Sequence, residues 1–474
     1  MASDLKHVIV VGGGASATLL AAHLLKDGTP DLRITIIEKA PKVGLGLAYG
    51  TGNRDHLLNV RAYNMSAFPD RPDHFWSWLG ETGLSAELRC ESSFSFIPRQ
   101  VYGRYLCSLL EREQGLPEAD KRLHVAQGEC ISMQVTPSGV IATLADGTSH
   151  VGHHAVLATG NEMSPPSSLP YITDPWTVAD VVGGRRQGDI FILGTGLTMI
   201  DCALSLLRSG HQGRIIAMSR RGLLPRIHQH TTPLQIEETD IPFGADIPYM
   251  LRWFRRLAAQ SAACGGDWTS VVDGVRPYTQ QLWRRLPMPA KHRFLRHART
   301  WWDVHRHRMA PEIGVQINEA IARGQLAVMS GKISSIQPTA DGAQVTYRPR
   351  GAADEVAIDV MTVVPCTGVL TNLAETRNPV LQSLLRQKIA RPDPLRLGID
   401  VTDDCALIDQ GGEVSRRVFA VGPLTRGTFW ETIAVPDIRT QVARLARQIL
   451  ADDAVPCTAA SENAASSQRE KASV

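Results

Sequence analysis

The chain lacks the features that would tie it to a membrane, a nucleic acid or a secretory route. It has no apolar run near the ~18 residues that a membrane span needs. Its N-terminus leads directly into an apolar strand and a glycine turn, so signal-peptide cleavage would destroy that turn. A formal net charge of +3 over 474 residues gives no reason to expect nucleic acid or an anionic membrane as a partner. We therefore expect a cytoplasmic protein.

Paired cysteines and clustered metal ligands are also missing. The eight cysteines are scattered, and no two have CxxC spacing, which argues against a disulfide scaffold, a zinc site and a redox-active dithiol. Asp303, His305 and His307 could suggest a metal. On a helix, however, side chains at i and i+2 point apart, and Arg306 and Arg308 would repel a cation. We expect no metal site.

A glycine turn near the N-terminus predicts a dinucleotide site. His7–Val11 is a β-branched run typical of a buried parallel strand. Gly12, Gly14 and Ala17 follow it with G-x-G-x-x-A spacing. In this motif the first glycine permits a tight turn, the second lets the backbone approach a pyrophosphate, and the small third residue lets helix and strand pack closely.

The residues after this turn indicate which nucleotide it holds. A helix over Thr18–Leu25 and a strand over Leu32–Ile37 complete a βαβ unit, and the strand closes on Glu38. A carboxylate there can accept both ribose hydroxyls and would repel a 2′-phosphate, while the helix N-terminus favours the pyrophosphate. The alternative is a strand–turn–helix with flexible glycines and no ligand. The expected contacts are Gly12, Gly14, Ala15, Ser16, Ala17, Glu38 and Lys39.

A second unit of the same type carries the opposite charge. It begins with a strand over Asp189–Leu193, a turn from Gly194 to Met199 and a helix over Leu197–Leu207. The next strand, Arg214–Met218, ends on Ser219-Arg220-Arg221. Guanidinium groups there would pair with a 2′-phosphate, which favours NADPH over NADH. The alternative is that both arginines are solvated surface charges. The expected contacts are Gly194, Gly196, Thr198, Ser219, Arg220 and Arg221.

Further segments occur in an ordered series along nearly the whole chain except its C-terminal tail. They are Gly44–Thr51, His56–Val60, Met65–Asp70, Phe75–Leu79, Pro98–Leu106, Ala158–Asn161, Gly196–Asp201, Arg221–Arg226, Trp302–Arg308, Cys366–Gly368 and Trp430–Pro436. On these segments the chain resembles the bacterial FAD/NAD(P)-binding protein family related to N-hydroxylating and flavin-containing monooxygenases. The resemblance implies FAD on the first turn and NADPH on the second.

The resemblance also implies roles for single residues. Asn59 would be the catalytic residue, pointing at the flavin C4a–N5 edge, where its amide could donate to a hydroperoxide oxygen and hold NADP⁺; the alternative is an asparagine that caps a turn. Met65 would wall the isoalloxazine, although core packing explains it nearly as well. A helix N-terminus near Thr432 would face the flavin O2 and stabilise reduced anionic flavin. The remaining implied FAD contacts are Arg99, Thr159, Gly160, Gly422 and Pro423.

Together these patterns predict an α/β protein with two Rossmann-type dinucleotide-binding domains and a helical insertion. The expected boundaries are 1–175 and 365–451 for a discontinuous FAD domain, 176–364 for the NADP domain with a helical cap at 241–324, and 452–474 for a disordered tail. A strand is also expected over Ile358–Val364.

The leading function hypothesis is an NADPH-dependent flavin monooxygenase in which a flavin C4a-hydroperoxide hydroxylates a small nucleophile, first of all an amine nitrogen, possibly of an amino acid. Its partners would be a small-molecule substrate and oxygen, and a homo-oligomer stays open. The alternatives are a reductase or dehydrogenase with a non-oxygen acceptor, and a non-enzymatic redox sensor.

Overall fold

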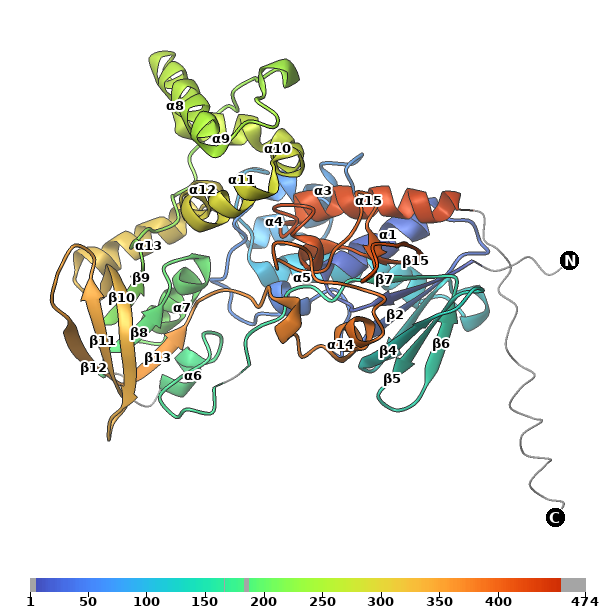
Figure 1. Cartoon of the computed structure of the whole chain (residues 1–474), viewed down its shortest axis with the longest axis horizontal. Helices are drawn as coiled ribbons and strands as arrows, with labels where there is room; N and C mark the ends of the chain where they lie inside the picture. The colour runs from blue at the N-terminus through green and yellow to red at the C-terminus, as the bar shows by residue number, and fades with distance from the viewer. Residues whose placement is uncertain (1–5, 166, 183–186, 453–474) are drawn as a thin grey trace, which may run out of the picture.

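The computed structural model describes residues 6–165, 167–182 and 187–452. Two six-stranded sheets lie side by side, each flanked by helices, and a group of helices rises above them (Figure 1). This arrangement confirms the predicted α/β class with two Rossmann-type units. No helix of the described residues is long and apolar enough to cross a bilayer.

The first sheet takes its strands from both ends of the chain. Its order is β14-β15-β7-β1-β2-β3, with only β14 antiparallel to its neighbour. The strands are β1 (His7–Val11), β2 (Arg33–Glu38), β3 (Leu123–Gln127), β7 (His154–Leu157), β14 (Ala406–Ile408) and β15 (Val414–Ala420). The helices packed with it include α1 (Ala15–Asp27), α5 (Arg99–Gln114) and α15 (Val435–Ala451).

Smaller elements surround this sheet. An antiparallel sheet consists of β4 (Cys130–Val135), β5 (Val140–Leu144) and β6 (Ser149–Gly152), with α14 (Pro379–Arg386) against β4. Short helices are α2 (Gly46–Tyr49), α3 (His74–Glu81), α4 (Leu84–Glu87) and α6 (Val178–Val182). The sequence did not predict β3 to β6, because their exposed faces interrupt the apolar pattern of a buried strand.

The second sheet has the order β12-β11-β10-β9-β8-β13. Its parallel half is β8 (Ile190–Leu193), β9 (Ile215–Ser219), β13 (Thr362–Pro365) and the first part of β10 (Leu326–Pro338); its antiparallel half adds β11 (Ala343–Pro349) and β12 (Val356–Val360). The single strand expected over Ile358–Val364 was therefore wrong. The strand is interrupted at Met361. The residues before it form β12 at the antiparallel edge of the sheet, and the residues after it form β13 in the parallel half.

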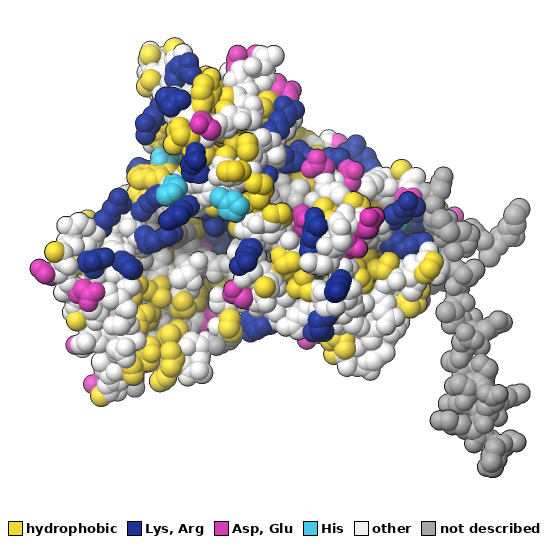
Figure 2. Space-filling view, in the orientation of Figure 1, with side chains coloured by type: hydrophobic (Ala, Val, Ile, Leu, Met, Phe, Trp, Pro, Cys, Tyr) yellow, Lys and Arg dark blue, Asp and Glu magenta, His cyan; other side chains and the backbone are white. Residues whose placement is uncertain are grey.

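The stretch 241–324 is mostly helical, as expected. It contains α8 (Ile247–Ala263), α9 (Trp268–Val275), α10 (Thr279–Arg285), α11 (Met288–Arg293), α12 (Arg299–Arg306) and α13 (Pro311–Ala322). Helix α13 packs on β10 and α7 (Leu197–Arg208) and belongs to the layer of the second sheet. We call α8 to α12, residues 247–306, the cap; it projects from the body and carries many basic side chains (Figures 1 and 2).

The cap is anchored on the segment that precedes α15. Trp283 of α10 stacks on Trp430 with ring centroids 4.6 Å apart, and its indole N–H donates to the Gly427 carbonyl at 2.8 Å. Arg306 of α12 donates through Nε to Glu431 at 2.8 Å, and Trp302 donates to the other oxygen of that carboxylate. The Arg306 and Glu431 side chains are only 8% and 4% exposed, so this is a buried ion pair.

The tail expected at 452–474 lies outside the described residues except for Asp452. The expected domain boundaries stay a prediction, although the sheet order already assigns strands from both ends of the chain to one sheet.

We predict that Glu431→Gln lowers the free energy of unfolding by about 3 kcal/mol at neutral pH, because Arg306 would remain buried without a counter-charge. Burial raises the pKa of the Glu431 carboxyl, but Arg306 and the Trp302 hydrogen bond outweigh burial and hold it below its ordinary 4.5. The stabilisation is therefore complete above pH 4.5 and lost as the pH falls through the lower folded value. Urea unfolding at a series of pH values should show that Glu431→Gln lowers the free energy of unfolding less in acid than at neutral pH. The control Glu312→Gln, at an exposed position, should change it little at any pH.

Candidate functional site

The first glycine turn has the shape that a pyrophosphate site needs. Gly12 has φ +99°, and a Cβ there would lie 2.6 Å from the Ala158 carbonyl oxygen, so only glycine fits. At Gly14 a Cβ would meet only the Gly46 Cα at 3.7 Å, which leaves room on that side. No side chain caps the N-terminus of α1. The free N–H groups of Ala15, Ser16 and Ala17 can therefore receive an anion.

Glu38 stands beside this turn, at the end of β2. Its two carboxylate oxygens accept the Gly13 N–H at 2.5 Å and the Ala40 N–H at 2.7 Å, which orients the group and leaves lone pairs for hydroxyl donors. Lys39 is exposed and forms an ion pair with Glu129 at 3.1 Å. The structure thus places Glu38 where the sequence expected it and gives Lys39 a partner within the protein.

Several other predicted contacts gather at the same edge of the first sheet. Thr159 and Gly160 follow shortly after β7, and Thr159 borders Gly12. The Gly422-Pro423 turn lies on the first turn of α1, since a Cβ on Gly422 would collide with the Ser16 hydroxyl. Gln441 of α15, which no sequence motif signals, accepts from the Gly422 N–H at 2.8 Å and the Thr432 hydroxyl at 3.2 Å. It links the turn to the start of α15.

Two further predicted contacts have structural roles in the described chain. Met65 is 2% exposed and belongs to the core of the first sheet. Arg99 donates through Nε to the Leu57 carbonyl at 3.1 Å and forms an ion pair with Asp201 of α7 at 2.9 Å. It therefore connects the helices of the two sheets, and an FAD contact for Arg99 stays a prediction.

The second turn repeats the geometry of the first. Gly194 has φ +113°, and a Cβ there would collide with the Cys366 carbonyl. A Cβ on Gly196 would have nothing within 4 Å, and no side chain caps the N-terminus of α7, whose first turn contains Thr198. Met199, which departs from the small-residue motif, is fully buried in the core beneath. This turn is therefore also open to an anion.

The end of β9 is built around Ser219. Its hydroxyl accepts from the Thr195 hydroxyl and from the Gly222 N–H, each at 2.9 Å. Arg220 is exposed, whereas Arg221 is partly buried and donates to the His297 carbonyl at 3.1 Å. Arg221 also lies 5.6 Å from the Trp301 ring centroid. Of the two arginines, Arg220 is the one that extends into solvent beside the turn.

Asn59 lies where the two halves of the molecule meet. It is partly buried, and its backbone carbonyl accepts from His228 Nε2 at 3.0 Å. Burial and the charge of Arg308 lower the pKa of His228 to about 4, so that a neutral imidazole makes this contact at neutral pH. The sequence analysis did not anticipate His228, because the contact joins residues 169 positions apart.

The three residues considered for a metal point to different partners. Asp303 pairs with Arg299 at 3.4 Å, the His305 ring lies 4.5 Å from that of Trp268, and His307 turns toward Glu431. The described residues contain no group of three or more His, Cys, Asp or Glu side chains that could hold a metal ion. The cysteines within the described ranges are free thiols, and Cys457 lies outside those ranges.

The two open glycines allow a reciprocal test. We predict that Gly14→Ala abolishes FAD retention, because its methyl group would fill the space above α1, whereas Gly196→Ala keeps FAD and weakens NADPH binding. Neither methyl group collides with the protein, so both variants should fold like the parent. The flavin absorbance per chain and NADPH titration measure the two effects. Loss of FAD from the Gly196 variant alone would contradict the assignment of the two turns.

The comparisons with known proteins agree with this geometry. Residues 9–162 match the family model described as FAD-NAD(P)-binding. No curated protein sequence matches the chain. Solved structures with the same fold include an ornithine N-hydroxylase from Kutzneria sp. 744 with reduced FAD, NADP⁺ and L-ornithine, at 14% identity and TM-score 0.66, covering 93% of this chain and 98% of that one.

Two more structures extend the series. A cadaverine monooxygenase from Erwinia amylovora, bound to FAD, has 13% identity and TM-score 0.65, covering 96% of this chain and 97% of that one. An L-lysine 6-monooxygenase from Pseudomonas syringae has 17% identity and TM-score 0.62, covering 94% and 99%. The expected cofactor classes are confirmed: the chain begins with an FAD-NAD(P)-binding domain and has, over nearly its whole length, the fold of these N-hydroxylases.

Proposed function

We propose that this protein is an NADPH-dependent flavoprotein monooxygenase that hydroxylates an amine nitrogen of a small substrate. The observation that carries the proposal is a pair of open glycine turns that have residues of opposite charge beside them. Glu38 stands beside the first turn, and Ser219-Arg220-Arg221 stand beside the second. A carboxylate suits unphosphorylated ribose and a guanidinium suits a 2′-phosphate, so FAD belongs on the first turn and NADPH on the second.

The residues at the first turn fit FAD. The N–H groups of α1 would hold the pyrophosphate, and Glu38 would accept the ribose hydroxyls. Gly422, Thr432 and the uncapped N-terminus of α15 would lie at the flavin end, where the helix dipole favours negative charge. Bound FAD would take hydride from NADPH and activate oxygen for transfer of one atom to the substrate.

Other residues of this chain would position the reactants. Asn59 would offer its side-chain amide at the flavin edge. The hydrogen bond from His228 to the Asn59 carbonyl would hold the backbone in place. The cap would cover the substrate and exclude water, because its anchor on Glu431 and Trp430 lies next to the start of α15. The substrate class rests on the fold neighbours, which act on ornithine, lysine and cadaverine. We place the reaction in the cytoplasm.

We predict that Arg220→Gln raises the KM for NADPH on the order of tenfold, because a charge-assisted hydrogen bond to the 2′-phosphate would be lost. The KM for NADH should change little, since NADH has no such phosphate. Steady-state NADPH and NADH oxidation by the purified holoenzyme measures both constants. The matched control is Arg255→Gln, an exposed arginine on α8. An equal effect of Arg220→Gln on both nucleotides would contradict NADPH selection by this residue.

The reaction itself is tested by its product. NADPH oxidation should accelerate with a small amine, and mass spectrometry under ¹⁸O₂ should show one labelled oxygen atom in the amine. The Asn59→Ala variant should still oxidise NADPH but should release more hydrogen peroxide per hydroxylated product, because the amide no longer supports oxygen transfer. Turnover with a quinone under anaerobic conditions, with no labelled product in air, would instead identify a reductase.

A further inference from the structure

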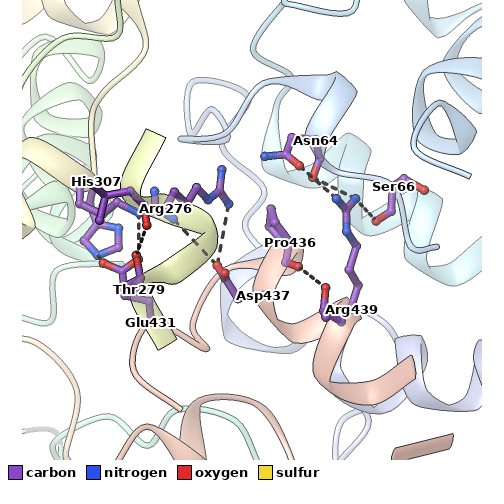
Figure 3. Close-up of polar contacts among 12 residues, drawn as sticks. Asn64, Ser66, Arg276, Thr279, His307, Glu431, Pro436, Asp437 and Arg439 are labelled. Atoms are coloured by element: carbon purple, nitrogen blue, oxygen red, sulfur yellow. Dashed lines mark hydrogen bonds and ion pairs between the residues drawn. The ribbon is translucent and has the colours of Figure 1, made fainter. Parts of the chain in front are cut away.

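Two arginine nitrogens at the junction of the cap and α15 are buried without a hydrogen bond. The cap contributes Arg276 and Arg306, and α15 contributes Asp437. Figure 3 shows Arg276 facing Asp437. Arg276 Nη2 lies 3.8 Å from Asp437 Oδ2, and Arg306 Nη2 lies 3.9 Å from the same atom. Both distances are too long for hydrogen bonds. We call these three residues the junction cluster.

The facing atoms of the junction cluster are inaccessible and unpartnered. Arg276 Nη2, Arg306 Nη2 and Asp437 Oδ2 are each buried without a hydrogen bond. The Arg306 side chain as a whole is 8% exposed. Buried donors of charged groups that remain unpaired cost several kcal/mol, so such atoms are normally satisfied by the protein, by water or by a ligand.

Positive charge exceeds negative charge around the junction cluster. The charges of Arg276, Arg306 and Arg439 act on Asp437, and those of Arg306 and Arg276 act on Glu431. Arg426 and Arg439 also have a buried Nε without a partner. Burial and the nearby Arg299 lower the pKa of Arg426 to about 10, which still leaves it charged at neutral pH.

The start of α15 adds to this field. The helix has 17 residues, and no side chain caps its N-terminus. Its dipole therefore brings further positive potential to the place where Asp437 meets the two cap arginines. Two guanidinium groups beside the positive end of a helix dipole form a recognisable environment for an anion with several acceptor atoms.

We propose that the junction cluster binds an anionic group of the substrate, a carboxylate or a phosphate, so that the hydroxylated molecule is an amine that also carries an anion. The word substrate rests on the proposed function, whereas anion binding does not. The fold neighbours leave this point open, because one acts on lysine and another on cadaverine, which lacks the carboxylate. A dication such as cadaverine would meet repulsion from the arginines here.

The proposal is tested by binding to the FAD-loaded protein at constant ionic strength. Glutarate, inorganic phosphate and cadaverine are the probes, and the fluorescence of the junction tryptophans Trp283, Trp302 and Trp430 is the signal. We expect saturable binding of glutarate or phosphate, with the tighter one identifying the anion, and none of cadaverine. Arg276→Gln should weaken anion binding on the order of tenfold, and Arg276→Lys should restore part of it.

A variant that binds the anion more tightly distinguishes anion binding by the junction cluster from a mere loss of folded protein. Asp437→Asn removes the competing carboxylate and should tighten glutarate binding several-fold, which no unfolding could imitate. The control Arg255→Gln, on the exposed side of α8, should leave the affinity unchanged. A general electrostatic effect would lower it in both arginine variants and would overturn the proposal.

The flavin itself could use these donors, and the test distinguishes that case. If Arg276→Gln shifts the flavin reduction potential or FAD affinity and leaves glutarate binding unchanged, the arginines serve the cofactor and the proposal is wrong. If anions bind as expected but no amine is hydroxylated, the anion site stands and the proposed function fails.

Discussion

The buried ion pair between Arg306 and Glu431 is the contact on which the position of the cap depends. It joins α12 to the segment before α15, and the stacked Trp283 and Trp430 lie beside it. Because both charges have left water, the pair tolerates only a narrow geometry, and losing one partner leaves the other uncompensated. The cap is thereby held against the segment that leads into α15.

The two glycine turns share one local design and differ in the charge of the residues beside them. Each has a glycine with positive φ against the neighbouring strand end and a second glycine that leaves space above an uncapped helix. What relates the two sites to one another is a set of contacts between the halves of the chain. Arg99 pairs with Asp201, and His228 donates to the Asn59 carbonyl. Hydride transfer between two bound nucleotides requires such fixed alignment.

The arginines of the helical stretch acquire different roles once the chain is folded. Arg306 is paired through Nε, Arg308 is paired with Asp273, and Arg276 keeps a buried nitrogen without a hydrogen bond. Under the proposed anion site, the donors at the junction of the cap and α15 would select among amines within a fold whose solved examples include an L-lysine 6-monooxygenase and a cadaverine monooxygenase. Fold alone leaves that choice open, because it specifies the cofactor scaffold and leaves the side chains under the cap to vary.

The sequence by itself determined the parts whose causes are local. Glycine spacing between an apolar strand and a helix predicted both turns. The end of the second strand of each unit placed Glu38 beside the first turn and Arg220 and Arg221 beside the second. It failed where pairing partners are distant: the segment expected as one strand at 358–364 divides between two parts of a sheet. The ion pair of Arg99 with Asp201 was not anticipated either. Gln441 and the junction cluster carry no sequence signal either. Turn and helix geometry follow from neighbouring residues, whereas contacts between segments far apart in the chain exist only after the two sheets, the cap and α15 have packed together.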